Sequence, residues 1–224
     1  MVVERACMER VCVTAGGGFI GSCLVKNLLE RGYIVHATST DPENPAKTSH
    51  LLSLEGAKER LHLFKANLYE KGSFDSAING CDFVINLATS LDYTKDPELG
   101  FIQPTIEGSL DILRACKEAK TVRRVIHTSS ITAAIPLTEN GEFKGKLDES
   151  CWTPIQYMTS KKPPYWMYYV AKTLAEQAAL EYGANHQLAV ITVLAALVAG
   201  PSFTPTFSLS SFMTLAPITG NREC

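Results

Sequence analysis

The sequence has no apolar run long enough to cross a membrane, no block of like charges and no secretory signal. Its longest apolar stretch, residues 188–199, is interrupted by Thr192 and is shorter than the roughly 20 residues of a membrane span. The 21 Lys and Arg residues nearly balance the 23 Asp and Glu residues, which argues against a nucleic-acid partner. Charged residues at positions 4, 5, 9 and 10 lie where a signal peptide has its apolar block. We therefore expect a cytoplasmic protein without a membrane span.

Metal-ligand and disulfide patterns are also absent from the sequence. The seven cysteines are an odd number, they are scattered along the chain, and no two of them form a Cys-x-x-Cys pair. Reduced thiols of a cytosolic protein fit this distribution better than a disulfide framework or a zinc site. We expect no bound metal and no disulfide framework.

What the sequence does have is a regular alternation of β-branched runs and amphipathic helical stretches. There is no internal repeat, and 224 residues with 46% hydrophobic content are enough to bury a core. Such an alternation builds a parallel sheet covered by helices. We expect strands at residues 11–14, 34–38, 61–65, 83–87, 124–128 and 189–194, and helices at residues 20–31, 73–79, 105–119 and 165–182. The predicted fold class is α/β, with a Rossmann-type doubly wound parallel sheet.

One segment departs from this alternation. Residues 135–164 contain four prolines and two glycines and are expected to form a long irregular connection. Connections of that length inside a compact fold are typically functional or mobile.

A glycine-rich turn, TAGGGFIGS, lies between the first expected strand and the first expected helix. Gly18 and Gly21 match the second and third glycines of the pattern GxxGxxG, while Ala15 occupies the place of the first. Glycines in such a turn let the backbone approach a pyrophosphate, whose charge is met by free amides and the positive end of the helix. An alanine in a left-handed turn costs on the order of 1 kcal/mol. With a strand before it and a helix after it, the turn predicts a dinucleotide site, and an ordinary strand-to-helix turn is the alternative.

The residues after the second expected strand bear on the choice of cofactor. An acidic side chain at that place binds a free ribose diol, whereas hydroxyls and cations receive a 2′-phosphate. Asp41 comes slightly late for the diol, and Lys47 is close enough along the chain to reach a phosphate, unless it is an ordinary surface lysine. We predict NADP, with NAD as the alternative.

Two further motifs are candidates for catalysis. Tyr168 and Lys172 lie four residues apart in YYVAK, so a helix places both on one face. An adjacent ammonium stabilises the phenolate and lowers the pKa of the phenol from ~10, which would make Tyr168 a usable proton donor. Tyr169 is three residues from Lys172 and is not excluded by spacing.

The fifth expected strand leads into HTSS, residues 127–130. Ligands of open parallel sheets bind outside the carboxyl ends of the strands, so these hydroxyls are expected to face the nucleotide crevice. One of them is suited to hydrogen-bond a carbonyl oxygen and stabilise the charge that grows as hydride arrives. A Ser-Ser pair at the end of a strand can instead belong to an ordinary turn, and YxxxK can occur by chance. The order of the two motifs along this predicted fold favours a catalytic site.

Five segments carry a resemblance to a known family: GFIGS, DPENPAK, LDILRACKEAKTVRRVIHTSS, LDESCW and WMYYVAKTLAEQAA. They are similar to the extended short-chain dehydrogenase/reductase family, in particular its dihydroflavonol reductase and anthocyanidin reductase group, and the resemblance covers nearly the whole chain. It implies that residues 1–224 form an NAD(P)-binding Rossmann domain of the epimerase/dehydratase type. It also implies a catalytic triad of Ser130, Tyr168 and Lys172 and NADPH-dependent reduction of a flavonoid-like phenolic substrate.

The same resemblance implies a set of cofactor contacts. These are Ala15, Gly18, Phe19, Ile20 and Gly21 along the pyrophosphate, Thr40 and Lys47 at the 2′-phosphate, Asn67 and Leu68 near the adenine, Ala88 on the nicotinamide side, and Tyr168 and Lys172. Family members commonly carry Arg at position 40, Asp at position 67 and Pro at position 195, where this sequence has Thr40, Asn67 and Ala195. Ile135 replaces the Asn favoured by dihydroflavonol reductases, and residues 162–164 resemble the anthocyanidin reductase side.

Relatives in this group continue well past ITGN, so we expect the substrate-binding C-terminal part to be largely missing. The alternatives to a flavonoid reductase are a catalytically weak or inactive dinucleotide-binding remnant, a sugar-nucleotide epimerase or dehydratase, and a cinnamoyl-CoA-type reductase. The sequence predicts neither the substrate's identity and stereochemistry nor the oligomeric state.

Overall fold

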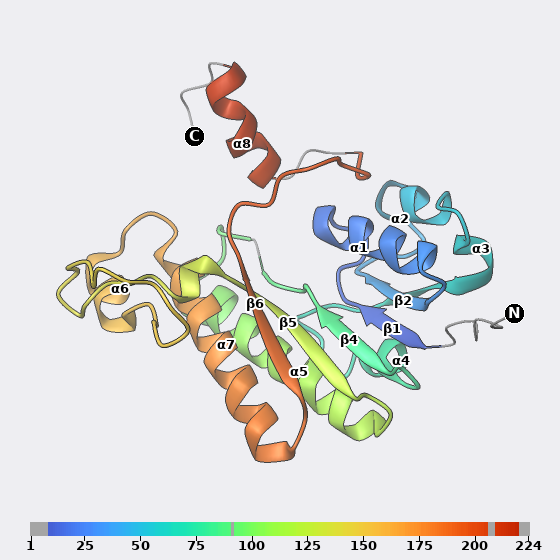
Figure 1. The fold of residues 1–224 in the computed structure, drawn as a ribbon, viewed down its shortest axis with the longest axis horizontal. Helices are drawn as coiled ribbons and strands as arrows, with labels where there is room; N and C mark the ends of the chain where they lie inside the picture. Colours follow the sequence, from blue (N-terminus) through green and yellow to red (C-terminus); the bar gives the residue numbers. More distant parts are fainter. Residues whose placement is uncertain (1–8, 91, 206–208, 220–224) are drawn as a thin grey trace, which may run out of the picture.

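A six-stranded parallel sheet forms the centre of the molecule in the computed structural model, which describes residues 9–90, 92–205 and 209–219. The strand order is β3-β2-β1-β4-β5-β6, and all neighbouring strands in it run parallel. The strands are β1 (Arg10–Val13), β2 (Ile34–Ser39), β3 (Leu61–Lys65), β4 (Phe83–Asn86), β5 (Arg124–Ser130) and β6 (Val190–Ala195). The order reverses between β1 and β4, as in a doubly wound sheet, so the predicted fold class is confirmed (Figure 1).

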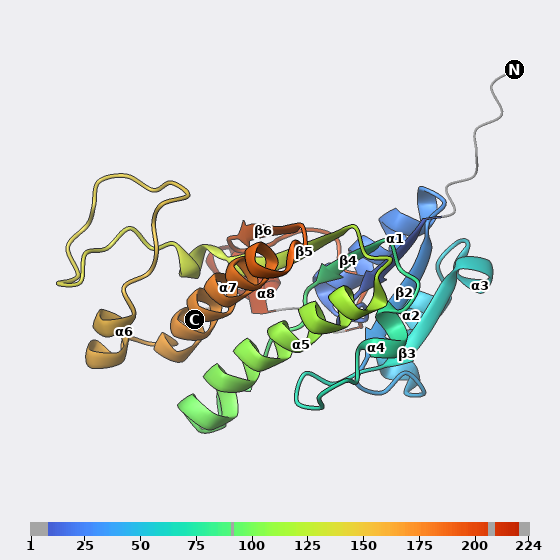
Figure 2. The same ribbon diagram turned by 90° about the horizontal axis from the view of Figure 1, so that it is seen from below.

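Helices cover both faces of this sheet. The helices of the described residues are α1 (Phe19–Glu30), α2 (Pro45–Leu52), α3 (Ala57–Arg60), α4 (Asp75–Ile78), α5 (Gln103–Ala119), α6 (Ile155–Lys161), α7 (Trp166–His186) and α8 (Leu209–Thr219), with short turns η1 (Pro97–Ile102) and η2 (Ile131–Ala133). Of these, α8 stands apart from the sheet (Figure 1). Figures 1 and 2 show α5 and α7 side by side beneath the half of the sheet that carries β4, β5 and β6.

The hydrophobic core divides between the two faces because strand side chains alternate. In β1, Val11 and Val13 pack with Val25 and Leu29 of α1, whereas Cys12 packs with Ile112 of α5 on the opposite face. All six side chains are almost fully buried. A strand buried on both faces has a continuous apolar sequence, which is why the strands were predictable.

The segment expected to be irregular contains a helix. Within residues 135–164, α6 occupies Ile155–Lys161 and ends at Lys162, which has a left-handed backbone with φ +48°. Pro163 and Pro164 follow at once and cannot continue the helix. The rest of the segment consists of turns and one antiparallel bridge between Leu137 and Phe143.

The end of β5 and the start of α7 determine which elements carry the predicted catalytic residues. β5 extends to Ser130, two residues beyond its expected end, so both serines of HTSS belong to the strand. α7 begins at Trp166, so Tyr168 lies in its first turn.

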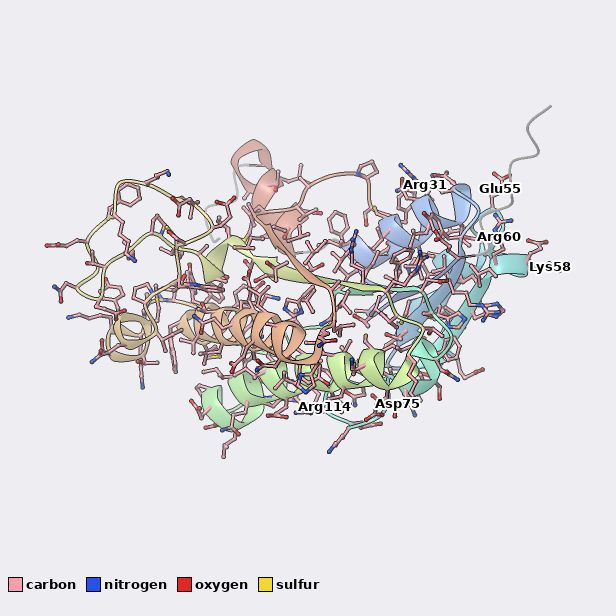
Figure 3. All side chains as sticks on the ribbon, turned by 60° about the horizontal axis from the view of Figure 1, so that its bottom comes forward. Arg31, Glu55, Lys58, Arg60, Asp75 and Arg114 are labelled. Carbon is pink, nitrogen blue, oxygen red and sulfur yellow. The ribbon has the colours of Figure 1, made fainter. Side chains whose placement is uncertain are left out.

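The outer surface near α1 and α3 is charged. Figure 3 labels Arg31, Glu55 and Lys58 at that end of the molecule, away from α7, and all three are exposed. β6 is the edge strand at the opposite end of the sheet, and its side chains Ile191 and Val193 are 46% and 47% exposed. Among the helices of the described residues, none is both long and apolar enough to cross a membrane.

Candidate active site

The glycine-rich turn lies at the carboxyl ends of β1 and β2, where the backbone is held in place by hydrogen bonds. The amide of Gly16 donates to the carbonyl of Thr38 at 3.0 Å, and the amide of Ala15 donates to the Thr38 hydroxyl at 3.0 Å. Ala15 has a φ of +52°, so the strain expected for alanine at this place is present. Its side chain is exposed and gains no burial in return.

The start of α1 is packed so closely against neighbouring backbone that two of its positions have no room for a side chain. A side-chain carbon at Gly17 would lie 2.6 Å from the Lys47 carbonyl oxygen, and one at Gly21 would lie 2.4 Å from the Ala15 carbonyl oxygen. The N-cap residue Gly18 offers no capping side chain, and no acidic residue occupies the first helical turn. No side chain of this helix start therefore competes with an anion for the positive end of the helix dipole, which fits a dinucleotide pyrophosphate.

Thr40 and Lys47 come together at the end of β2. The Lys47 ammonium donates a hydrogen bond to the Thr40 hydroxyl at 2.8 Å, and both side chains are exposed. A cation beside a hydroxyl suits a phosphate monoester.

At the end of β3, the loop that follows holds Asn67 and Leu68 firmly. The Asn67 amide donates to the Glu70 carboxylate at 3.0 Å, and its oxygen accepts from the Tyr69 backbone at 3.2 Å. Leu68 packs over Gly108 of α5, where an added side-chain carbon would lie 2.4 Å from it. Both residues therefore lie at the carboxyl edge of the sheet.

A buried polar network that the sequence did not reveal joins the ends of β1, β4 and β5. The Thr14 hydroxyl donates to the Asn86 side-chain oxygen at 2.9 Å and accepts from the backbone amide of Ala88 at 2.9 Å. The Asn86 amide nitrogen lies 3.2 Å from Nδ1 of His127. This network fixes the position of Ala88. Next to it, the Thr89 hydroxyl is buried without a hydrogen-bond partner among the described residues.

His127 is neutral in this network. Its Nδ1 accepts from the Asn86 amide, so the proton of the imidazole lies on Nε2. Burial, and to a smaller extent the nearby charge of Lys172, lowers its pKa to about 3.

Three consecutive residues of β5 contact three successive turns of α7. Ser130 hydrogen-bonds Tyr168, the Thr128 carbonyl accepts from the Lys172 ammonium at 2.8 Å, and the Ser129 hydroxyl donates to the Glu176 carboxylate at 2.5 Å. We call these three pairs the β5–α7 ladder. The predicted residues Ser130, Tyr168 and Lys172 are thereby brought together, and the contact with Ser130 distinguishes Tyr168 from Tyr169.

The expected effect of Lys172 on Tyr168 is wrong for this arrangement. Burial raises the pKa of Tyr168 above its ordinary value, and the hydrogen bond with Ser130 acts in the opposite direction. The Lys172 ammonium is turned to the Thr128 carbonyl instead. Burial also lowers the pKa of Lys172 to about 8, an effect that the Glu176 carboxylate opposes.

Aromatic rings stand beside Tyr168. Tyr93 is stacked on Phe101 at 5.2 Å between ring centroids, and its ring lies 5.4 Å from Tyr165 and 6.5 Å from Tyr168. Tyr165 is 58% exposed. This aromatic wall was not predicted, since Tyr93 precedes its tyrosine partners by more than 70 residues.

Known proteins resemble this chain over nearly its whole length. It is 52% identical over 213 residues to a putative anthocyanidin reductase of Ginkgo biloba, a match that covers 95% of this chain and 62% of that one. It is 48% identical over 213 residues to a dihydroflavonol 4-reductase of Dianthus caryophyllus, covering 94% and 58%. Among solved structures, vestitone reductase from alfalfa superposes with a TM-score of 0.80 at 39% identity, over 92% of this chain and 63% of that one.

These similarities confirm the resemblance to dihydroflavonol and anthocyanidin reductases that the motifs indicate. The chain spans about three fifths of the length of these relatives. The family model described as the NAD dependent epimerase/dehydratase family matches residues 11–216. With that match over most of its length, the chain belongs to the NAD dependent epimerase/dehydratase family.

Proposed function

We propose that this chain carries the cofactor site and the catalytic residues of an NADPH-dependent reductase that transfers hydride to a carbonyl or related unsaturated centre of a flavonoid-like phenolic substrate. The observation that carries the proposal is the β5–α7 ladder, which places Ser130, Tyr168 and Lys172 together at the carboxyl edge of the sheet. The names of the relatives, which include anthocyanidin, dihydroflavonol and vestitone reductases, support the reaction class.

The cofactor site that we propose follows the carboxyl edge from β3 to β5. Residues 15 and 18–21 would hold the pyrophosphate, Asn67 and Leu68 the adenine side, and Ala88 the nicotinamide side. Thr40 and Lys47 would receive the 2′-phosphate, which favours NADPH over NADH. NADPH supplies the hydride when it is bound.

The three side chains of the ladder have separate tasks in this proposal. Tyr168 is protonated at neutral pH, since its pKa lies above the ordinary phenol value, and it is the acid that donates its proton to the substrate oxygen. Ser130 donates a hydrogen bond to the same oxygen and stabilises the charge that develops there. Lys172 would hold the nicotinamide ribose and supply a positive charge nearby.

The aromatic wall supports a phenolic substrate. Tyr93 and Tyr165 stand next to the proposed proton donor, and exposed aromatic rings bind other rings by edge-to-face or offset contacts. The cytoplasm is the compartment that we propose, because the five described cysteines are free thiols and four of them are buried.

Two features favour a second candidate, a dinucleotide-binding domain with little or no catalysis. Ala15 holds a strained left-handed backbone in the turn that would carry the pyrophosphate, and the 2′-phosphate place has Thr40 where the family resemblance leads us to expect arginine. Both features would weaken cofactor binding. A sugar-nucleotide epimerase is less favoured. UDP-galactose 4-epimerase is only 22% identical to this chain, and at that level the similarity supports a shared fold without a shared reaction.

The test is to titrate NADPH and NADH into the protein and then to follow NADPH oxidation with dihydroflavonols, anthocyanidins and sugar nucleotides. We expect Tyr168→Phe to abolish turnover while NADPH binding stays within a factor of about two, since the lost hydroxyl serves the chemical step. Tyr169→Phe is the matched control and should keep full turnover. NADPH binding by the unmodified protein without reduction of any phenolic would favour the second candidate, and equal turnover in Tyr168→Phe would refute the mechanism.

A further inference from the structure

Glu176 is a buried carboxylate at the lower end of the β5–α7 ladder. Its residue is 3% exposed, and its Oε2 accepts a hydrogen bond of 2.5 Å from the Ser129 hydroxyl, which is 5% exposed. A carboxylate is costly to bury unless hydrogen bonds and an opposite charge compensate it. Ser129 supplies the hydrogen bond, and the ammonium of Lys172 lies one helical turn away on the same face of α7.

Lys172 is buried nearby, and its ammonium requires a negative charge to compensate its burial. It is 4% exposed, and the one hydrogen bond that the structure gives its ammonium goes to the uncharged Thr128 carbonyl. A buried ammonium next to a neutral acceptor tends to lose its proton. The Glu176 carboxylate is the group on α7 that opposes this loss.

The other titratable groups around Lys172 do not compensate its charge. From β5, His127 faces it as a neutral imidazole because burial lowers the pKa of His127 to about 3. On α7, Tyr168 is an uncharged phenol, and burial raises its pKa further above the ordinary value. α7 also packs against α5, β6 and the turns η1 and η2, but the charged group that acts on the pKa of Lys172 is Glu176 of α7 itself (Figure 2).

We propose that Glu176 is a positioning residue of the site: its buried carboxylate anchors the Ser129 hydroxyl and keeps the Lys172 ammonium charged one helical turn away. Through Ser129 it fixes the strand next to Ser130, the residue that contacts Tyr168. The catalytic consequence of this role rests on the proposed reductase function, whereas the effect on Lys172 does not.

The experiment measures the protonation of Lys172 directly, in the protein without cofactor. The protein is labelled with ¹³C at the lysine ε-carbons, and the Lys172 signal is identified by its loss in Lys172→Met. We expect Glu176→Gln to lower the titration midpoint of Lys172 by about one pH unit or more, because the amide keeps the size and the hydrogen bond but lacks the charge. Ser129→Ala is the matched control: it removes the hydrogen bond, keeps the carboxylate, and should leave the midpoint nearly unchanged.

An unchanged midpoint in Glu176→Gln overturns the proposal. Glu176→Asp keeps the charge on a shorter side chain, and a midpoint closer to that of the unmodified protein supports the electrostatic role even if Glu176→Gln does not fold. If neither variant differs from the unmodified protein, Glu176 is only a packing residue. NADPH affinity is measured alongside, below and above the Lys172 midpoint. Absence of NADPH binding by the unmodified protein refutes the proposed function and leaves the Lys172 titration to decide this inference.

Discussion

Replacement of Ala15 by glycine should stabilise the protein, although glycine usually destabilises. Ala15 has φ +52°, a conformation that costs an alanine roughly 1–2 kcal/mol relative to its favoured regions. Glycine adopts that conformation readily, but it gains about 0.4–1 kcal/mol of conformational freedom in the unfolded chain. The methyl group of Ala15 is exposed, so its removal sacrifices little buried apolar area. The net expectation is a gain of about 0.5–1 kcal/mol in the free energy of unfolding.

Urea unfolding followed by tryptophan fluorescence and circular dichroism measures this difference. With a denaturant slope of about 2–3 kcal/mol per molar, the midpoint of Ala15→Gly should rise by about 0.3 M. The matched control is Ala184→Gly, an exposed position in α7, where glycine should lower the stability by up to about 1 kcal/mol. If Ala15→Gly lowers the midpoint as the control does, the turn does not hold a strained alanine in solution. Tighter NADPH binding by Ala15→Gly would show in addition that the strain bears on the cofactor.

Two further predictions concern charge. Lys47→Ala should weaken NADPH binding about tenfold or more while NADH binding stays nearly constant, because a charge-assisted hydrogen bond to phosphate contributes about 1.5–3 kcal/mol. Lys58→Ala, at an exposed position, is the control. An equal loss of affinity for both cofactors would contradict the 2′-phosphate assignment. His127 should make the protein less stable in acid, because the pKa of His127 is lowered to about 3 in the folded state from 6.5. Between these values the unfolded chain binds a proton that the folded chain does not, so stability is complete above pH 6.5 and falls as the pH drops toward 3, by about 1.4 kcal/mol per unit. His127→Leu should remove this pH dependence of the free energy of unfolding, measured by urea unfolding over acidic pH. His62→Leu, at an exposed position, is the control and should keep it. An unchanged pH dependence in His127→Leu would show that His127 is not buried as a neutral group.

The centre of the sheet was predictable from the sequence because its strands β1 and β2 are largely buried on both faces. Val11 and Val35 lie in short β-branched runs of the kind that parallel strands require, and the structure places each run in a strand. The site motifs were predictable for a related reason: Tyr168 and Lys172 are close in sequence, and helical periodicity alone puts them on one face. The join between β5 and Tyr168 followed from the rule that ligands bind at the carboxyl ends of parallel strands.

Short helices and long-range polar contacts were not predictable in the same way. α2 has a local signal, since the Asn44 side chain caps the Ala46 amide and Pro45 occupies the first helical position, but its eight residues lack a strong apolar period. The Thr14–Asn86 hydrogen bond joins residues 72 positions apart, and the Ser129–Glu176 hydrogen bond spans 47 positions. No local pattern encodes such pairs.

The pKa of Tyr168 shows the same limit. The sequence reveals that a lysine follows it by four residues, but not that both side chains are largely buried or that the ammonium turns to the Thr128 carbonyl. Burial decides the direction of the shift, and burial is a property of the assembled fold.

The outer strand β6 has a consequence for how the protein behaves in concentrated solution. Its apolar side chains Ile191 and Val193 are exposed, and among the described residues one side of its backbone has no neighbouring strand. An uncovered edge of this kind is a template on which a strand of another molecule pairs, and apolar side chains strengthen that attraction. Self-association of the purified protein should therefore begin at β6 and grow with its concentration.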